Sequence, residues 1–152
     1  MDPIQLLKKQ HREVEALFKK IEKARGAQRR ALMDELTGDL KLHMAIEEKI
    51  FYPAVQTLPA KKVEDMTLEA YEEHAVVKLV LAELPGVDPE DDRFDAKMTV
   101  LSELIEHHVE EEEDEMFKTA KKLGRAELNA LGDRMAAEVE AVKGPTRRGR
   151  AA

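Results

Sequence analysis

One ordered pattern of histidine and glutamate residues occurs twice in this chain. His11 is followed further along by His43-Met-Ala-Ile-Glu47, and His74 is followed in the same way by His108-Val-Glu-Glu-Glu112. On a helix, residues four apart lie on one face a turn apart, so each His-x-x-x-Glu segment presents an imidazole beside a carboxylate. Two such pairs and the two single histidines could supply the ligands of two metal ions.

A purely structural role is the alternative, because a single histidine on an apolar face is more often a hydrogen-bonded core residue than a ligand. Here four histidines lie on the apolar stripes of four different predicted helices, and Glu47 and Glu112 lie on the same stripes. An unpaired buried carboxylate is costly or shifts its pKa strongly. Lys78 lies near a stripe, but no Lys or Arg faces inward to neutralise the pair. The pattern therefore favours a metal site.

The residue types restrict the metal. Cysteine is absent, so nitrogen and oxygen must hold any ion, and disulfides, thiolate ligands and a cysteine nucleophile are excluded. Imidazole mixed with carboxylate favours Fe, Mn or Zn, because Ca and Mg prefer oxygen alone. A single tetrahedral zinc would leave two of these ligands unused, whereas two ions bridged by two carboxylates use them all. The Glu-x-x-His motif of ferritin-like di-iron proteins is absent.

Apolar residues at steps of three and four predict the helices that position these side chains. Asp2 followed by Pro3 marks the first helix start, and glycine or proline marks most of the breaks. The predicted helices run from residue 3 to the break at Gly26, from 28 to 52 with a stop at Pro53, and over 63–84, 92–123 and 125–142. Short connections predict an all-α fold, an antiparallel up-down four-helix bundle with a short extra C-terminal helix.

The repeat also organises the chain. Residues 1–53 and 62–118 look like two copies of one helical hairpin, so a pseudo-twofold axis would bring the ligand-bearing faces together. We expect the bundle to span residues 1–123, an accessory helix 124–143 and a disordered basic tail 144–152.

The repeat distinguishes two adjacent histidines. His107 and His108 cannot both point at the bundle centre, and the stripe through Leu101, Ile105 and Met116 includes His108. His107 is therefore expected at the flank of the stripe or near solvent.

Charge and hydropathy exclude several classes of protein. The net charge of −7 argues against nucleic acid binding by the body of the protein. No apolar run approaches the ~18 residues of a membrane-spanning helix, and the N-terminal segment lacks the features of a signal peptide. We therefore expect a cytoplasmic protein that contacts neither nucleic acid nor membrane and is a monomer or a weak homodimer.

The ordered pattern resembles that of the hemerythrin-like HHE cation-binding family over roughly residues 3–123. The resemblance implies a four-helix bundle around a non-haem di-iron centre, with iron preferred over manganese or zinc. It implies that Glu47 and Glu112 bridge the two ions together with an oxo or hydroxo group. The metal ligands that it implies are His11, His43, Glu47, His74, His108 and Glu112.

The chain departs from the oxygen-carrying hemerythrins, which look to have two histidines one turn apart on the third helix. Only His74 is present here, and the positions one turn away hold Ala70 and Lys78. Alanine has no ligand atom and a protonated lysine has no free lone pair, so one more coordination position is open. Tyr71 and Tyr52 are candidates to line this site, and ordinary packing is the alternative role for both.

The sequence thus predicts a di-iron protein that reacts with small oxidants, through hydrogen peroxide decomposition or a reaction with nitric oxide or O₂. Peroxidase-like, catalase-like or nitric-oxide-scavenging turnover would make it an enzyme. Reversible O₂ binding, or iron and oxygen sensing without turnover, is the alternative. A bundle that binds no metal is the third hypothesis.

Overall fold

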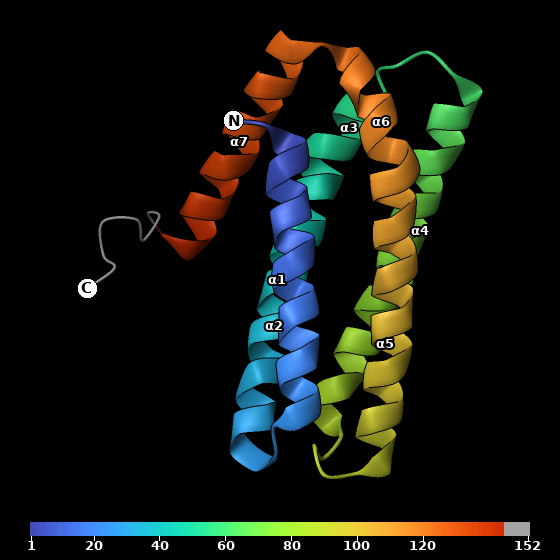
Figure 1. The fold of residues 1–152 in the computed structure, drawn as a ribbon. Helices are drawn as coiled ribbons and strands as arrows, with labels where there is room; N and C mark the ends of the chain where they lie inside the picture. Colours follow the sequence, from blue (N-terminus) through green and yellow to red (C-terminus); the bar gives the residue numbers. More distant parts are fainter. Residues whose placement is uncertain (145–152) are drawn as a thin grey trace.

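The computed structural model describes residues 1–144, which contain helices and no strand. Four long helical segments run antiparallel, and a fifth packs against their outside (Figure 1). The predicted all-α bundle with an extra C-terminal helix is confirmed, and residues 145–152 of the predicted tail lie outside the described residues. The elements are α1 (Pro3–Lys23), α2 (Gly26–Ile46), η1 (Glu47–Phe51), α3 (Tyr52–Val55), α4 (Lys61–Glu83), η2 (Leu84–Gly86), α5 (Asp92–Glu111), η3 (Glu112–Met116), α6 (Phe117–Ala120), η4 (Lys121–Leu123) and α7 (Arg125–Lys143).

Capping residues define the starts of two bundle helices. The Asp2 carboxylate accepts a hydrogen bond from the Ile4 backbone N–H at 2.9 Å, with Pro3 in the first turn. Asp91 caps α5 in the same way through the Arg93 N–H at 2.8 Å. Both satisfy N–H groups that have no partner within the helix, and the predicted start of the first helix is therefore correct.

The predicted end of the second helix at Pro53 is wrong, because the helix continues through α3 to Val55. Proline lacks an N–H and its ring clashes with the carbonyl four residues earlier. Here η1 is a π-helical turn in which the Tyr52 N–H donates to the carbonyl of Glu47, five residues back. This wider turn lies directly before Pro53 and accommodates its ring.

The apolar core is divided by the layer that holds the histidines. Along α1, Ile4 and Leu7 belong to one buried cluster, whereas Val14, Leu17 and Ile21 belong to another. His11 lies between them, and His74 divides α4 in the same way. The polar layer is thus enclosed by apolar clusters at both ends of the bundle.

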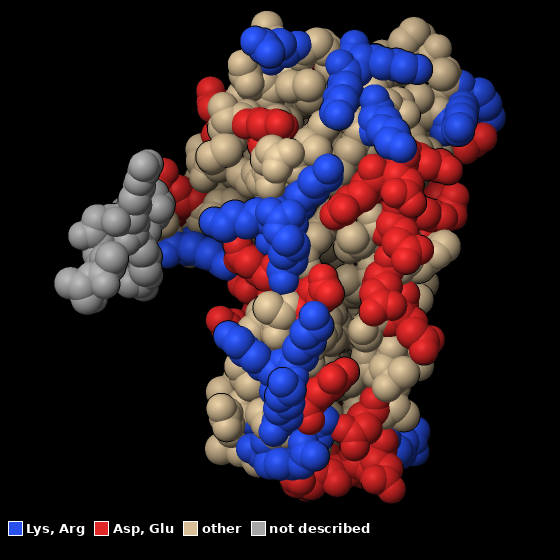
Figure 2. Space-filling model, viewed as in Figure 1, with Lys and Arg blue, Asp and Glu red and all other residues tan. Residues whose placement is uncertain are grey.

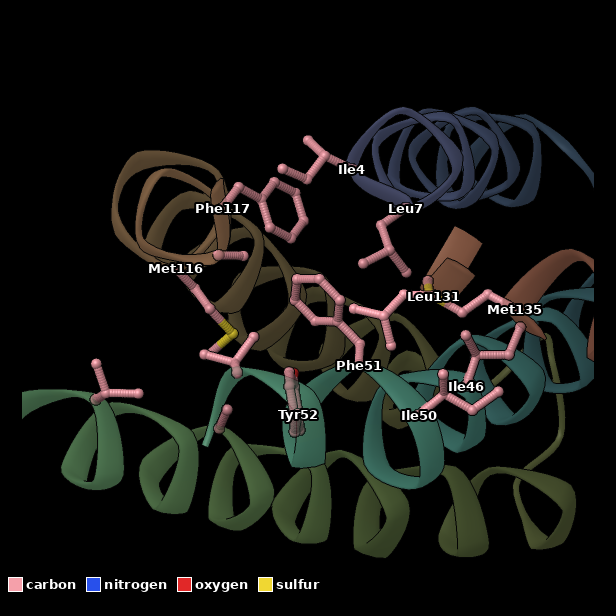
Figure 3. Close-up of a cluster of buried hydrophobic side chains, with 14 of the residues drawn as sticks. Ile4, Leu7, Ile46, Ile50, Phe51, Tyr52, Met116, Phe117, Leu131 and Met135 are labelled. Carbon is pink, nitrogen blue, oxygen red and sulfur yellow. The ribbon is translucent and has the colours of Figure 1, made fainter. Parts of the chain in front are cut away.

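One of these clusters also attaches α7. Phe51 and Phe117 pack edge to face with centroids 5.8 Å apart, and Figure 3 shows them beside Leu7 of α1 and Leu131 of α7. Aromatic pairs in this arrangement stabilise a core beyond the area they bury. The accessory helix is therefore part of the hydrophobic core at this end.

Charged side chains are segregated on the surface. On the face shown in Figure 2, carboxylates gather over α5 and η3, whereas lysine and arginine side chains gather over α1. Within residues 1–144, no helix has the length and apolar character needed to cross a membrane.

The N-terminus lies against α7 through a glycine. The Met1 ammonium lies 3.2 Å from the Asp133 carboxylate, next to Gly132. A Cβ atom on Gly132 would lie 1.8 Å from the Met1 carbonyl oxygen and 3.1 Å from the Pro3 nitrogen. Backbone packed this closely has no room for a side chain, so α7 can dock here only with glycine at this position.

Replacement of Gly132 by alanine should therefore destabilise the protein. We expect Gly132→Ala to cost about 1–3 kcal/mol, as overpacked sites do, and to lower the Tm by several degrees in thermal unfolding. Gly38→Ala is the matched control, because nothing lies within 4 Å of its added Cβ. Alanine in a helix interior should raise stability there by about 0.5–1 kcal/mol. Equal Tm values for the two variants would contradict the packing described.

Candidate metal centre

The six side chains selected from the sequence lie together in the middle of the bundle. They come from α1, α2, η1, α4, α5 and η3, and every one of them is buried. The set is His11, His43, Glu47, His74, His108 and Glu112.

The side chains form two groups that share a carboxylate. His11, His43, Glu47 and Glu112 form the first subsite, and Glu47, His74 and His108 form the second, with candidate ligand atoms within 4.8 Å of one another in each. Glu47 Oε1 lies 3.3 Å from His43 Nε2 and 3.0 Å from His74 Nε2.

Glu112 also lies between the subsites. Its Oε1 is 3.2 Å from His11 Nε2, and its Oε2 is 3.2 Å from His108 Nε2. Each glutamate thus faces a histidine of both subsites, which is the arrangement needed for a carboxylate that bridges two ions.

Four buried atoms of the first subsite have no partner with hydrogen-bond geometry, although His11 Nε2 and Glu112 Oε1 lie 3.2 Å apart and His43 Nε2 lies 3.3 Å from Glu47 Oε1. The four atoms are His11 Nε2, His43 Nε2, Glu47 Oε2 and Glu112 Oε1. An unsatisfied buried polar atom costs roughly 1–3 kcal/mol, and native structures contain few. All four atoms can offer a lone pair to a cation, so a metal ion fits the donor set and removes the cost.

The second ring nitrogen of each histidine is hydrogen bonded outside the centre. A donor N–H at Nδ1 leaves Nε2 as the lone-pair nitrogen and directs it inward. The four pairs are His11 with Glu113 at 2.8 Å, His43 with Gln10 at 2.7 Å, His74 with Glu48 at 2.8 Å and His108 with Glu73 at 2.6 Å.

Sequence reasoning missed these outer partners, although the repeat contains a signal for them. Glu48 and Glu113 each follow an inward glutamate, and Gln10 and Glu73 each precede a single histidine. The internal repeat thus extends from the ligand set to the groups that orient it.

Tyr52 reaches into the second subsite. Its hydroxyl donates to Glu112 and lies 3.2 Å from His74 Nε2 and 3.1 Å from His108 Nε2. Burial raises the pKa of Tyr52 well above its usual value, and the charges of Glu47 and Glu112 raise it further. The phenol is therefore protonated at neutral pH. Among the tyrosines, Tyr52 is the one that lines the centre.

Tyr71 lies one layer further out. Its ring packs against that of Tyr52 with centroids 5.2 Å apart, and its hydroxyl donates to the Glu48 carbonyl at 3.1 Å. It contacts the tyrosine and the outer glutamate of the second subsite, and Ala70, which is buried, supplies no ligand atom beside it.

The π-helical turns explain why the α-helical period alone could not choose between the two candidates, Tyr52 and Tyr71. Glu47 begins η1 and Glu112 begins η3, and residues five apart lie close together across such a turn. The residue five positions after Glu47 is Tyr52, and the residue five positions after Glu112 is Phe117, which stacks on His11 at 5.9 Å. The two halves match in their ligands and differ in this pair.

The charges of the centre shift the pKa values of His108 and Glu47 in opposite directions when no metal is bound. Burial lowers the pKa of His108, but the carboxylates of Glu112, Glu47 and Glu73 outweigh it and hold the pKa well above 6.5. Burial raises the pKa of Glu47, but the charge of His43 and several hydrogen bonds outweigh that effect and hold the pKa well below 4.5.

His107 lies outside the centre, as its flank position predicts. Its side chain is 63% exposed, with Nε2 3.1 Å from Glu111 and 3.5 Å from Glu73. Lys78 is also directed away from the two subsites and pairs with Glu48 at 2.9 Å.

A small cavity of about 20 Å³ adjoins the four histidines. A volume of this size holds about one water-sized molecule. The rest of its lining is apolar and comprises Val14, Leu40, Met44, Ile105 and Val109.

Together these features define a helical-bundle protein whose buried His and Glu clusters can hold metal ions. The hemerythrin HHE cation-binding domain matches residues 2–120. The chain therefore belongs to the hemerythrin HHE cation-binding family.

A solved structure of the same family is similar to this chain, and so are two other proteins. The crystal structure of a hemerythrin HHE cation binding domain-containing protein from Mycobacterium kansasii superimposes with a TM-score of 0.82 at 28% identity, covering 95% of this chain and 88% of that one. An uncharacterised protein of Mycobacterium tuberculosis is 29% identical over 95% of this chain and 89% of its own length. A DNA nickase of Nostoc sp. is 25% identical over 74% of this chain and 31% of that protein.

Replacement of the two adjacent histidines should separate their roles. We expect His108→Ala to lose most of the metal that the native protein carries, because an inward imidazole disappears. His107→Ala should retain it, since His107 faces solvent. Elemental analysis of the purified variants measures the difference, and equal loss from both would contradict the register of α5.

Metal binding should release protons. The folded-state pKa values of His108 and His11 are raised above 6.5. Protonation of these two histidines therefore stabilises the metal-free fold below pH 6.5. This stabilisation is lost as the pH rises through the raised pKa values. A metal ion competes with the same protons. We therefore expect the Tm gain from Zn²⁺, a redox-silent probe, to increase above pH 6.5. Calorimetry in buffers of different ionisation enthalpy should detect proton release, and its absence would contradict these protonation states.

Proposed function

We propose that the centre holds two iron ions and reacts with small oxidants, namely hydrogen peroxide, O₂ or nitric oxide. Four imidazoles and two carboxylates suit iron among the common ions. In this proposal His11 and His43 bind one ion and His74 and His108 bind the other. Glu47 and Glu112 would be shared by the two ions, and an oxo or hydroxo group would accompany them.

The asymmetry of the two subsites carries the proposal of reactivity. The second subsite has His74 and His108, with the buried methyl group of Ala70 one turn from His74. The hydroxyl of Tyr52 lies within 3.2 Å of both imidazoles. This subsite therefore has a proton donor beside its two imidazoles, while Ala70 supplies no ligand atom.

The protein residues contribute a proton, orientation and exclusion of water. Bound iron would supply Lewis acidity and electrons. Tyr52, protonated at neutral pH, could turn its single O–H from Glu112 towards a small molecule in the second subsite. Glu48 and Glu73 hold the His74 and His108 rings in place. The apolar clusters on both sides keep larger molecules away, so the proposed partners are small molecules. We propose that the protein is cytoplasmic and is a monomer or a weak homodimer.

Loading the protein with iron and adding peroxide or nitric oxide tests this proposal. We expect loss of the added oxidant and a changed optical spectrum. Tyr52→Phe should keep its iron, because the six proposed ligands remain, but should slow the reaction by roughly tenfold or more, as loss of a positioned proton donor does. Tyr71→Phe is the control and should react like the native protein. Unchanged oxidant and an unchanged spectrum in the iron-loaded native protein would overturn the proposal.

Reversible O₂ binding is a second candidate, supported by the 20 Å³ cavity with its apolar lining beside the histidines. It predicts a spectrum that changes with O₂ and returns fully when O₂ is removed, without net oxidation. Sensing would require in addition that a partner distinguishes the protein with bound O₂ from the protein without it.

A further inference from the structure

A second hollow lies on the surface between α2–η1 and α4, outside the metal centre. Its volume is about 280 Å³, and it is lined by Lys41, Ala45, Glu48, Lys49 and Lys78. Lys41 and Ala45 lie four residues apart on one face of α2, and Lys49 of η1 lines the same hollow. Ala45 has only a methyl group between the two longer side chains, and this leaves the space open.

Positive charge dominates this hollow. The Lys78 ammonium lies 3.0 and 2.9 Å from the two carboxylate oxygens of Glu48, and this pair is electrically balanced. Lys41 and Lys49 form no ion pair with any of residues 1–144. Two lysines without an ion pair to the described residues therefore line the hollow, in a chain whose net charge is −7.

The internal repeat shows that the fold does not require these lysines. When His43 is aligned with His108 and His11 with His74, the counterparts of the lining residues are all acidic. Lys41, Ala45, Lys49 and Lys78 correspond to Glu106, Glu110, Asp114 and Glu15. Only Glu48 keeps its type, as Glu113, and both of these glutamates hold a histidine. The basic character is thus particular to one side of the bundle.

We propose that this hollow binds a small anion with two or more negative charges, such as inorganic phosphate or a dicarboxylate. Lys41 and Lys49 would approach it from one helix and Lys78 from the opposite one. Ammonium groups on flexible stems suit such ligands, since they act as point charges that adapt to the position of the anion. The site needs no metal, so the proposal stands independently of the proposed function.

The hollow is connected to the second subsite through two contacts. Lys78 pairs with Glu48, and Glu48 accepts the hydrogen bond from His74 Nδ1 at 2.8 Å. An anion that draws the Lys78 ammonium towards itself leaves more negative charge on Glu48, beside His74. Occupation of the hollow should therefore be sensed at the metal centre.

Calorimetric titration of the purified protein with inorganic phosphate at constant ionic strength tests the site. We expect saturable binding with one phosphate per chain. Lys41→Gln with Lys49→Gln should weaken it by about tenfold or more, since both unpaired charges are removed. Ala45→Met, which fills the hollow without changing charge, should weaken it similarly.

A matched control removes the same charge elsewhere. Lys121→Gln with Lys122→Gln alters two exposed lysines of η4 that do not line the hollow and should leave phosphate affinity within about twofold. Equal weakening by the two double variants would show general charge attraction and overturn the proposal. Two other results would also overturn the proposal. One is unchanged phosphate binding in all variants, which is expected if phosphate binds at the metal centre, and the other is no saturation below about 10 mM phosphate.

Discussion

Two carboxylates buried at the centre of an apolar bundle are the constraint on which the rest of the structure depends. Glu47 and Glu112 are almost completely inaccessible, and burial of such charges is costly unless they are paired. Four inward imidazoles and the Tyr52 hydroxyl surround them. Without metal, protons on His11 and His108, whose pKa values are raised, offset part of the charge. With metal, the same lone pairs become a ligand set, so protons and cations compete for one location.

The surrounding layers keep this arrangement in place. The outer hydrogen bonds direct each Nε2 inward, and the apolar clusters above and below exclude water. Glu48 and Glu113 connect the two hairpins, because each is located on one hairpin and holds a histidine of the other. The ligand geometry and the association of the two hairpins are therefore stabilised by the same contacts.

Helical periodicity and the internal repeat were sufficient to predict the bundle and to bring six side chains together. A four-residue step between His43 and Glu47 has one geometric meaning on an α-helix, and the second copy selected His108 over its neighbour. The sequence named Tyr52 as a candidate to line the site, but neither its exact position nor the end of the second helix follows from this period. Both depend on a π-helical turn, whose wider spacing breaks the period used for the prediction. Gln10 and Glu73 lie outside the inward stripes; the repeat places each of them before a single histidine, and distances between helices identify which histidine each one binds.

The two π-helical turns have a consequence for helical phase. Each adds about one residue to a turn, which rotates everything after it by roughly 100° relative to an uninterrupted α-helix. The segments on either side of the centre therefore present their apolar stripes in different phases, and the metal layer is the point where the phase changes in both halves. The end of the bundle that packs against α7 therefore has a helical phase of its own, different from that of the other end.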